Sequence, residues 1–124
     1  MRNTTDVAEL TIYEKPTCTT CRNLAALLAE RGVAYDSVDY HVTGLTEAEV
    51  RALVAKTGGP ASALLRARDA VYKELGLGDR EIADDEAIAL MAEHPTLLER
   101  PVVVRGDRAV LARPIERALE LLDD

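Results

Sequence analysis

The two cysteines of this 124-residue chain lie three positions apart, where a strand pattern gives way to a helix pattern. The apolar run at residues 10–13 predicts a buried strand, residues 14–16 predict a turn, and the periodicity of residues 19–31 predicts a helix. Cys18 and Cys21 therefore stand at the start of the predicted helix. Backbone N–H groups without intrahelical partners and the positive end of the helix dipole favour an anion there. A free thiol has a pKa of about 8.5, and this placement predicts that Cys18 ionises more readily.

A second strand completes a βαβ unit over the first 40 residues. Gly32 is a typical residue to end the helix, and the alternation of residues 33–40 predicts a strand parallel to the first. A C-x-x-C motif beside such a unit is typical of a thioredoxin-like redox protein. Cys21 either resolves a mixed disulfide on Cys18 or stays reduced as a small buried residue. The alternative that both cysteines are inert core residues stays open, because cysteine is often buried.

The middle of the chain carries helix patterns and no strand pattern. Thr46 followed by Glu49 predicts a capping box that starts a helix, which Gly58 ends. A short apolar turn or helix is expected at residues 63–66. Further helices are expected at residues 70–75 and from Asp84, as the cap, to a stop at His94.

Two strands and a helix follow this helical stretch. Residues 101–105 and 108–112 predict strands joined by a hairpin turn, and Pro114 leads into a last amphipathic helix whose inner face is Ile115, Ala118, Leu119 and Leu122. The order predicts an α/β, thioredoxin-like (glutaredoxin-like) fold, with a helical insertion at about residues 45–95 between its βαβ and ββα halves. We expect residues 10–124 to form a single domain, preceded by a flexible N-terminal tail at residues 1–9.

The composition argues against several classes of protein. Hydrophobic residues make up 48% of the chain, which excludes a disordered protein. The formal net charge of -7 argues against sequence-independent binding to nucleic acid or to anionic membranes. No apolar stretch approaches the roughly 20 residues that span a bilayer, and the N-terminus lacks the apolar segment of a signal peptide. Two cysteines are too few for a secreted disulfide scaffold, so we predict a cytoplasmic protein that binds neither nucleic acid nor membranes.

Three arginines lie next to apolar runs. Arg66 follows a short apolar segment, and Arg100 and Arg113 each precede a proline at the edge of a predicted strand. Such an arginine is either a surface residue whose stem covers apolar neighbours or a fixed anion clamp, and spacing alone favours the surface role. The only histidines, His41 and His94, do not show the spacing of zinc ligands, so no metal site is predicted.

Several short motifs follow one another along the chain: Thr11-Ile12-Tyr13, Pro16-Thr17-Cys18, Ala63-Leu64-Leu65-Arg66, Tyr72-Lys73-Glu74-Leu75-Gly76-Leu77, His94-Pro95, Arg100-Pro101-Val102-Val103-Val104 and Arg113-Pro114. In this order and at these separations they resemble the glutaredoxin-linked arsenate reductase family, from about residue 10 to the C-terminus. The resemblance implies a thioredoxin-like fold with a helical insertion, and it implies that Cys18 is the cysteine that attacks arsenate.

The resemblance also assigns the three arginines. Arg66, Arg100 and Arg113 match the arginines that bind the oxyanion and its thiol adduct. Three guanidinium groups around one thiolate would lower the pKa of the thiol and hold a tetrahedral oxyanion in bidentate hydrogen bonds. Such an enzyme binds no cofactor and draws electrons from an external thiol reductant. We expect a monomer.

The chain departs from the family pattern at two positions. Cys21 stands where the single-thiol enzymes carry serine, which suggests an internal disulfide. This leaves open whether thioredoxin, or glutathione with glutaredoxin, supplies the electrons. Glu14 stands where such enzymes often carry a histidine, and its charge would oppose a thiolate.

Two other functions stay open. Spx-type regulators share this fold and a C-x-x-C motif, bind RNA polymerase, and use the cysteine pair as a redox switch; residues 18–22 resemble theirs. Arg113 with its proline favours the reductase instead. The second alternative is a disulfide reductase that depends on glutathione or thioredoxin.

Overall fold

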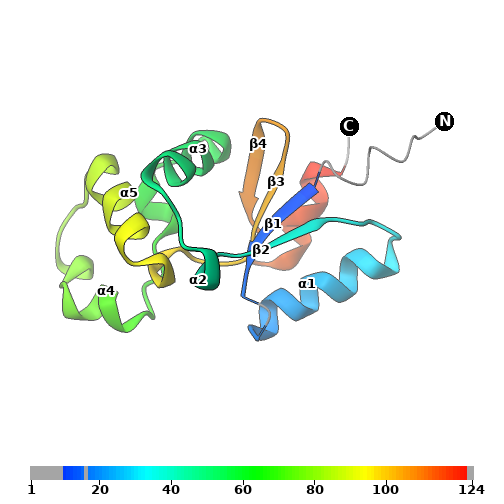
Figure 1. Cartoon of the computed structure of the whole chain (residues 1–124), viewed down its shortest axis with the longest axis horizontal. Helices are drawn as coiled ribbons and strands as arrows, with labels where there is room; N and C mark the ends of the chain where they lie inside the picture. Colours follow the sequence, from blue (N-terminus) through cyan, green and yellow to red (C-terminus); the bar gives the residue numbers. More distant parts are fainter. Residues whose placement is uncertain (1–9, 16, 123–124) are drawn as a thin grey trace. The chain divides into compact units, whose positions relative to one another are not determined.

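The computed structural model describes residues 10–15 and 17–122, and this part of the chain divides into two compact units (Figure 1). The first unit comprises the chain up to Tyr40 together with the chain from Arg100 onward, and the second is His41–Glu99. The tail predicted at residues 1–9 lies outside the described residues. That residues 10–124 fold as a single domain stays a prediction.

A four-stranded mixed sheet forms the centre of the first unit. Its strands are β1 (Leu10–Glu14), β2 (Asp36–Asp39), β3 (Val102–Arg105) and β4 (Arg108–Leu111), in the order β2-β1-β3-β4. Strand β1 is parallel to β2 and antiparallel to β3, and β3 is antiparallel to β4. The predicted parallel crossover and the predicted C-terminal hairpin are both confirmed, and together they give the thioredoxin-like topology.

The core of the first unit is aliphatic and lies between the sheet and its helices. In β1 the side chains alternate, so that Leu10, Ile12 and Glu14 are buried while Thr11 and Tyr13 are half-buried. The core cluster consists of Leu10, Ile12, Leu24, Leu28, Val103, Val110, Ala112, Ala118 and Leu121. Every member is an aliphatic side chain, as expected for a chain without phenylalanine or tryptophan.

The second strand is shorter than the alternation predicts. Helix α1 (Thr19–Glu30) ends at Gly32, whose φ of 67° is left-handed, and the Val33 N–H donates to the Leu28 carbonyl. The chain at Val33 is therefore still engaged with the helix end and not with the sheet. Val33 and Tyr35 pack against the core from this connecting segment, and pairing with β1 begins at Asp36.

The last helix differs in type from the prediction. Residues Ile115–Leu121 form the 3₁₀-helix η5, in which side chains three positions apart share a face. Ala118 and Leu121 are buried at that spacing. Leu119 and Leu122, which an α-helical period places on the inner face, are only half-buried.

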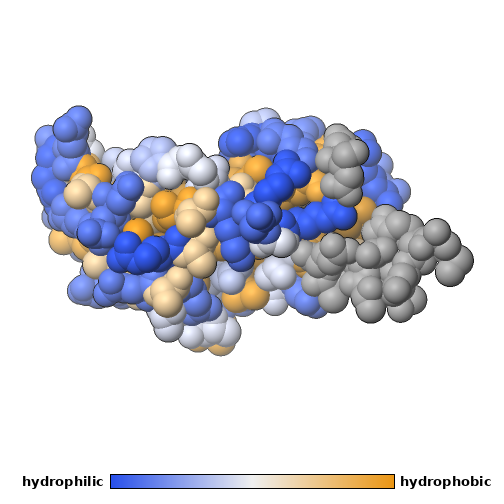
Figure 2. All heavy atoms as spheres, turned by 90° about the horizontal axis from the view of Figure 1, so that it is seen from above, coloured by the Kyte–Doolittle hydropathy of each residue, from blue (hydrophilic) through white to orange (hydrophobic). Residues whose placement is uncertain are grey.

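The second unit is built from short helices. They are α3 (Glu47–Thr57), η2 (Ala61–Leu64), α4 (Ala70–Glu74), η3 (Leu77–Asp79), α5 (Asp84–Glu93) and η4 (Pro95–Leu97); α2 (Tyr40–Thr43) precedes them. An isolated antiparallel bridge joins Leu65 to Leu98, although this stretch carries no strand pattern. In the described part of the chain, no helix has the length and apolar character to cross a membrane. Hydrophilic side chains cover much of the face in Figure 2, with apolar residues scattered between them.

The start of α3 confirms a prediction, whereas the start of α5 corrects one. The Glu49 N–H donates to the Thr46 hydroxyl at 3.1 Å, and the Thr46 N–H donates to the Glu49 carboxylate at 2.9 Å, which forms the predicted capping box. Asp84 does not cap α5, because Ala83 occupies that position. The Asp84 carboxylate instead accepts a hydrogen bond from the Ala61 N–H at 3.0 Å and so ties η2 to α5.

The capping box predicts a stability effect. Thr46→Ala removes the acceptor for the Glu49 N–H, so we expect the free energy of unfolding to fall by about 1 kcal/mol. Urea unfolding followed by circular dichroism measures it. Thr43→Ala is the control, because the exposed Thr43 hydroxyl only donates to the adjacent Gly44 carbonyl. Equal losses in the two variants would contradict a specific role for the cap.

Candidate active site

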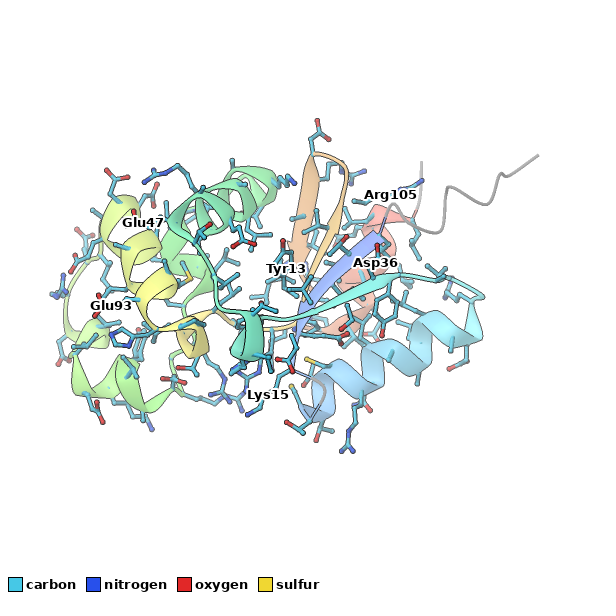
Figure 3. All side chains as sticks on the ribbon, in the orientation of Figure 1. Tyr13, Lys15, Asp36, Glu47, Glu93 and Arg105 are labelled. Carbon is cyan, nitrogen blue, oxygen red and sulfur yellow. The ribbon has the colours of Figure 1, made fainter. Side chains whose placement is uncertain are left out.

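Cys18 occupies the N-cap position of α1. Its backbone is extended, and no side chain caps the helix. The Cys18 N–H donates to the Lys15 carbonyl at 2.9 Å, which closes the turn between β1 and α1 (Figure 3). Cys18 is half-buried, Cys21 is 1% exposed, and both are free thiols. The sequence-based placement of the cysteine pair at a strand–helix junction is confirmed.

The thiol of Cys18 is set up to ionise near neutral pH. Partial burial raises its pKa, but hydrogen bonds to the sulfur outweigh burial. The donors are the backbone N–H of Cys21, the Cys21 thiol, the Arg100 guanidinium and the backbone N–H of Thr20, and together they lower the pKa to about 7. Two of them are helix-start N–H groups, as predicted from the position of Cys18.

The thiol of Cys21 behaves in the opposite way. Burial is the main cause that raises its pKa, to about 12, and the backbone N–H of Lys15 only partly offsets this. The hydrogen bond to Cys18 and the negative charges of Cys18 and Glu14 raise it further. Cys21 thus stays protonated while Cys18 ionises, so Cys18 is the more readily ionised thiol of the pair.

Arg100 is a buried anion partner and not a surface residue. It is 7% exposed. Burial alone would lower its pKa, but the Tyr40 hydroxyl and the Cys18 sulfur each accept a hydrogen bond from the guanidinium and raise the pKa above its ordinary value. The structure therefore brings Cys18 and Arg100 into direct contact within the first unit.

Arg113 supports the backbone of Arg100. The Arg113 Nε donates to the Arg100 carbonyl oxygen at 2.7 Å. Both Arg100–Pro101 and Arg113–Pro114 are cis peptide bonds. The two C-terminal arginines of the predicted site are thus linked by a hydrogen bond from the side chain of Arg113 to the main chain of Arg100.

Arg66 belongs to the second unit, where acidic side chains hold it. Its guanidinium lies 3.7 Å from the Asp69 carboxylate and 3.6 Å from the Glu99 carboxylate, and its backbone N–H donates to the Leu97 carbonyl at 2.7 Å. The side chain is 21% exposed. Its participation in an oxyanion site with Cys18 stays a prediction.

Two residues act on the site in ways that the sequence did not indicate. Tyr40 is fully buried and contacts Arg100, and no motif marks it. Glu14 is buried, and its negative charge contributes to the raised pKa of Cys21. The described residues hold no group of three or more histidine, cysteine, aspartate or glutamate side chains that could bind a metal ion.

Comparison with known proteins places this site in a family. The model of the ArsC family matches residues 13–121. Arsenate reductase of Escherichia coli (strain K12) is 37% identical over 118 residues, which cover 95% of this chain and 84% of that protein. Arsenate reductase of Neisseria meningitidis is 37% identical over 109 residues, which cover 87% of this chain and 93% of that protein.

A solved structure shows the same similarity. An arsenate reductase from Vibrio cholerae superposes with a TM-score of 0.83 at 39% sequence identity, over 90% of this chain and 96% of that one. The similar proteins span nearly the whole chain.

The contact between Arg100 and Cys18 predicts a change in thiol reactivity. Arg100→Gln removes a positive donor from the thiolate, so we expect the pKa of Cys18 to rise from about 7. If it rises to about 8, the thiolate fraction at pH 7 falls about fivefold. The pH dependence of the iodoacetamide alkylation rate measures this change, because the protonated Cys21 contributes little at neutral pH.

Arg31→Gln is the matched control for that experiment. It removes the same charge from an exposed position at the end of α1. An unchanged alkylation midpoint in Arg100→Gln, or an equal rise in both variants, would show that the contact does not set the pKa of Cys18.

Proposed function

The chain belongs to the ArsC family, and we propose that it is a thiol-dependent arsenate reductase in which Cys18 is the nucleophile. The observation that carries the proposal is the half-buried Cys18 thiol with a pKa of about 7, in contact with the buried Arg100. At neutral pH about half of the Cys18 population is thiolate, next to a fixed positive charge that suits an anionic substrate.

The first step is the attack of the Cys18 thiolate on the arsenic of arsenate. The sulfur lone pair forms a sulfur–arsenic bond, the bond from arsenic to an arsenate hydroxyl breaks, and that hydroxyl takes up one proton from solvent and leaves as water. This proton balances the charge lost from the sulfur, and the remaining arsenate oxygens keep their negative charge. Arg100 stays paired with an anion throughout, because its guanidinium contacts the sulfur to which the oxyanion becomes attached.

Arg113 and Arg66 complete the proposed oxyanion site. The hydrogen bond from the Arg113 Nε to the Arg100 carbonyl fixes the Arg113 guanidinium next to the backbone of Arg100, whose own guanidinium contacts Cys18. Arg66, at 3.6–3.7 Å from two carboxylates, has longer contacts than a tight ion pair and can exchange them for substrate oxygens.

The second step uses Cys21. Its sulfur attacks the Cys18 sulfur, a disulfide forms, and the electron pair of the sulfur–arsenic bond goes to arsenic, which leaves as arsenite. The two thiols together lose two electrons, and arsenic gains them as As(V) is reduced to As(III). An external thiol reductant then restores the dithiol. We propose thioredoxin for this role, with glutathione and glutaredoxin as the other candidate, and a monomer that works in the cytoplasm without a bound cofactor.

Arsenite formation tests the proposal directly. We expect turnover with thioredoxin in the wild type, at least 1,000-fold less in Cys18→Ser, and a loss of thioredoxin-coupled turnover in Cys21→Ser. A parallel assay with glutathione and glutaredoxin identifies the donor. Absence of arsenite with both donors would overturn the arsenate assignment, and turnover of an organic disulfide instead would indicate a disulfide reductase.

The proposed arginine site predicts a binding defect. Arg66→Gln and Arg113→Gln each remove a charged hydrogen-bond donor, so we expect KM for arsenate to rise about tenfold in each variant. Steady-state kinetics with varied arsenate measure this. Arg51→Gln is the control, because Arg51 pairs with Asp85 on the surface. A KM equal to that of the control variant would show that the substituted arginine does not bind the oxyanion.

A further inference from the structure

Glu14 is a buried acid at the end of β1. It is 6% exposed, on the same face of the strand as Leu10 and Ile12, and it pairs in register with Asp39 of β2. Within the described residues, no hydrogen bond or ion pair engages its carboxylate. A carboxylate in an apolar environment without a cation is unfavourable, so its burial calls for an explanation in the chemistry of the site.

The groups affected by Glu14 identify its surroundings. Its negative charge contributes to the raised pKa of Cys21 on α1 and to that of Tyr35, in the segment before β2. For Tyr35, burial is the larger cause, and Cys21 contributes as well. The strand face that carries Glu14 also carries Leu10 and Ile12, which share one core cluster with Leu24 and Leu28 of α1. Cys21 is buried one turn before Leu24 on that helix, so Glu14 and Cys21 face the same interface between β1 and α1. Asp39 is the neighbouring acid on the sheet.

The second step of the proposed reaction requires a proton acceptor at this interface. With a pKa of about 12, only roughly one Cys21 in 100,000 is a thiolate at pH 7. Cys21 is also shielded from water, so solvent cannot readily take its proton. Of the groups that act on Cys21, Lys15 supplies a backbone donor and Cys18 is consumed in the adduct. The carboxylate of Glu14 remains.

We propose that Glu14 accepts the proton of Cys21 as the Cys21 sulfur attacks Cys18, and returns it when the disulfide is reduced. The inference rests on the proposed function, in which Cys21 resolves the Cys18 adduct. In the step, the S–H bond of Cys21 breaks, its proton goes to a Glu14 carboxylate oxygen, and its electron pair forms the S–S bond. The electron pair of the bond from Cys18 to its adduct departs with the leaving group.

Substitution of Glu14 distinguishes this role from a purely electrostatic one. If the carboxylate only opposed ionisation of Cys21, Glu14→Gln would ease ionisation and speed disulfide closure. If it is the proton acceptor, the same substitution slows closure, because no base remains beside the thiol. The two roles therefore predict changes of opposite sign.

Reaction with Ellman's reagent separates the two thiols. The first release of thionitrobenzoate reports attack by Cys18, and the second reports closure by Cys21. At pH 7 we expect Glu14→Gln to slow the second release about 100-fold and to leave the first within about threefold. Glu14→Asp restores part of the rate. Glu30→Gln, on the exposed side of α1, is the matched control and leaves both releases unchanged.

A measurement on the wild type does not depend on the folding of any variant. Proton transfer during the attack predicts a solvent deuterium isotope effect on the second release and none on the first. An isotope effect near unity on the second release, or a second release in Glu14→Gln as fast as in the wild type, would overturn the proposal.

Failure of the proposed function is distinguishable from failure of this inference. If the wild type releases only one equivalent of thionitrobenzoate, Cys21 is not the resolving thiol and Glu14 has no role as its base. This conclusion does not depend on the result of the arsenate assay. A second release that depends on Glu14, in a protein that forms no arsenite, would support the proton transfer from Cys21 to Glu14. It would overturn only the arsenate assignment.

Discussion

The hydrogen bonds from the start of α1 to the Cys18 sulfur are the interaction on which the site depends. A helix start needs acceptors for its first N–H groups, and the N-cap residue here is a cysteine, without a side-chain oxygen. The sulfur takes that place for the N–H groups of Thr20 and Cys21. Because the folded state lowers the pKa of Cys18 to about 7, ionisation of the thiol stabilises the fold. This contribution is complete above the unfolded pKa near 9 and is lost as the pH falls through about 7.

One turn of helix gives the two thiols different chemistry. Cys18 precedes the first turn and is half-buried, so donors reach its sulfur. Cys21 lies inside the helix on its buried face, so burial dominates and its proton is retained. The charge that is stabilised on Cys18 also raises the pKa of Cys21. The proposed nucleophile, Cys18, and the proposed resolving thiol, Cys21, therefore differ in ionisation before any substrate binds.

The features that the sequence predicted correctly are those encoded by neighbouring residues. The capping box of Thr46 and Glu49, the helix start at the cysteine pair and the hairpin between β3 and β4 each depend on a few adjacent positions. The errors and omissions arise from long-range contacts. The Asp84 carboxylate accepts a hydrogen bond from Ala61, 23 positions away, and does not cap α5. Tyr40 contacts Arg100, and no periodic pattern in the sequence indicates this contact. The sequence position of Glu14 did not indicate that its charge also acts on the buried Cys21, because this effect depends on the packing of β1 against α1.

The burial of Arg100 bears on the class of substrate. A buried guanidinium needs a compensating anion, and in the free protein the Cys18 thiolate supplies it, with the Tyr40 hydroxyl as a further acceptor. Attack of the thiolate on a neutral disulfide would expel a thiolate and leave a neutral mixed disulfide beside Arg100, so the guanidinium would lose the negative charge of the Cys18 sulfur. Attack on an oxyanion leaves negative oxygens attached to the same sulfur. The charge balance at Arg100 is kept only in the second case, and this favours an oxyanion over an organic disulfide as the first electrophile that Cys18 meets.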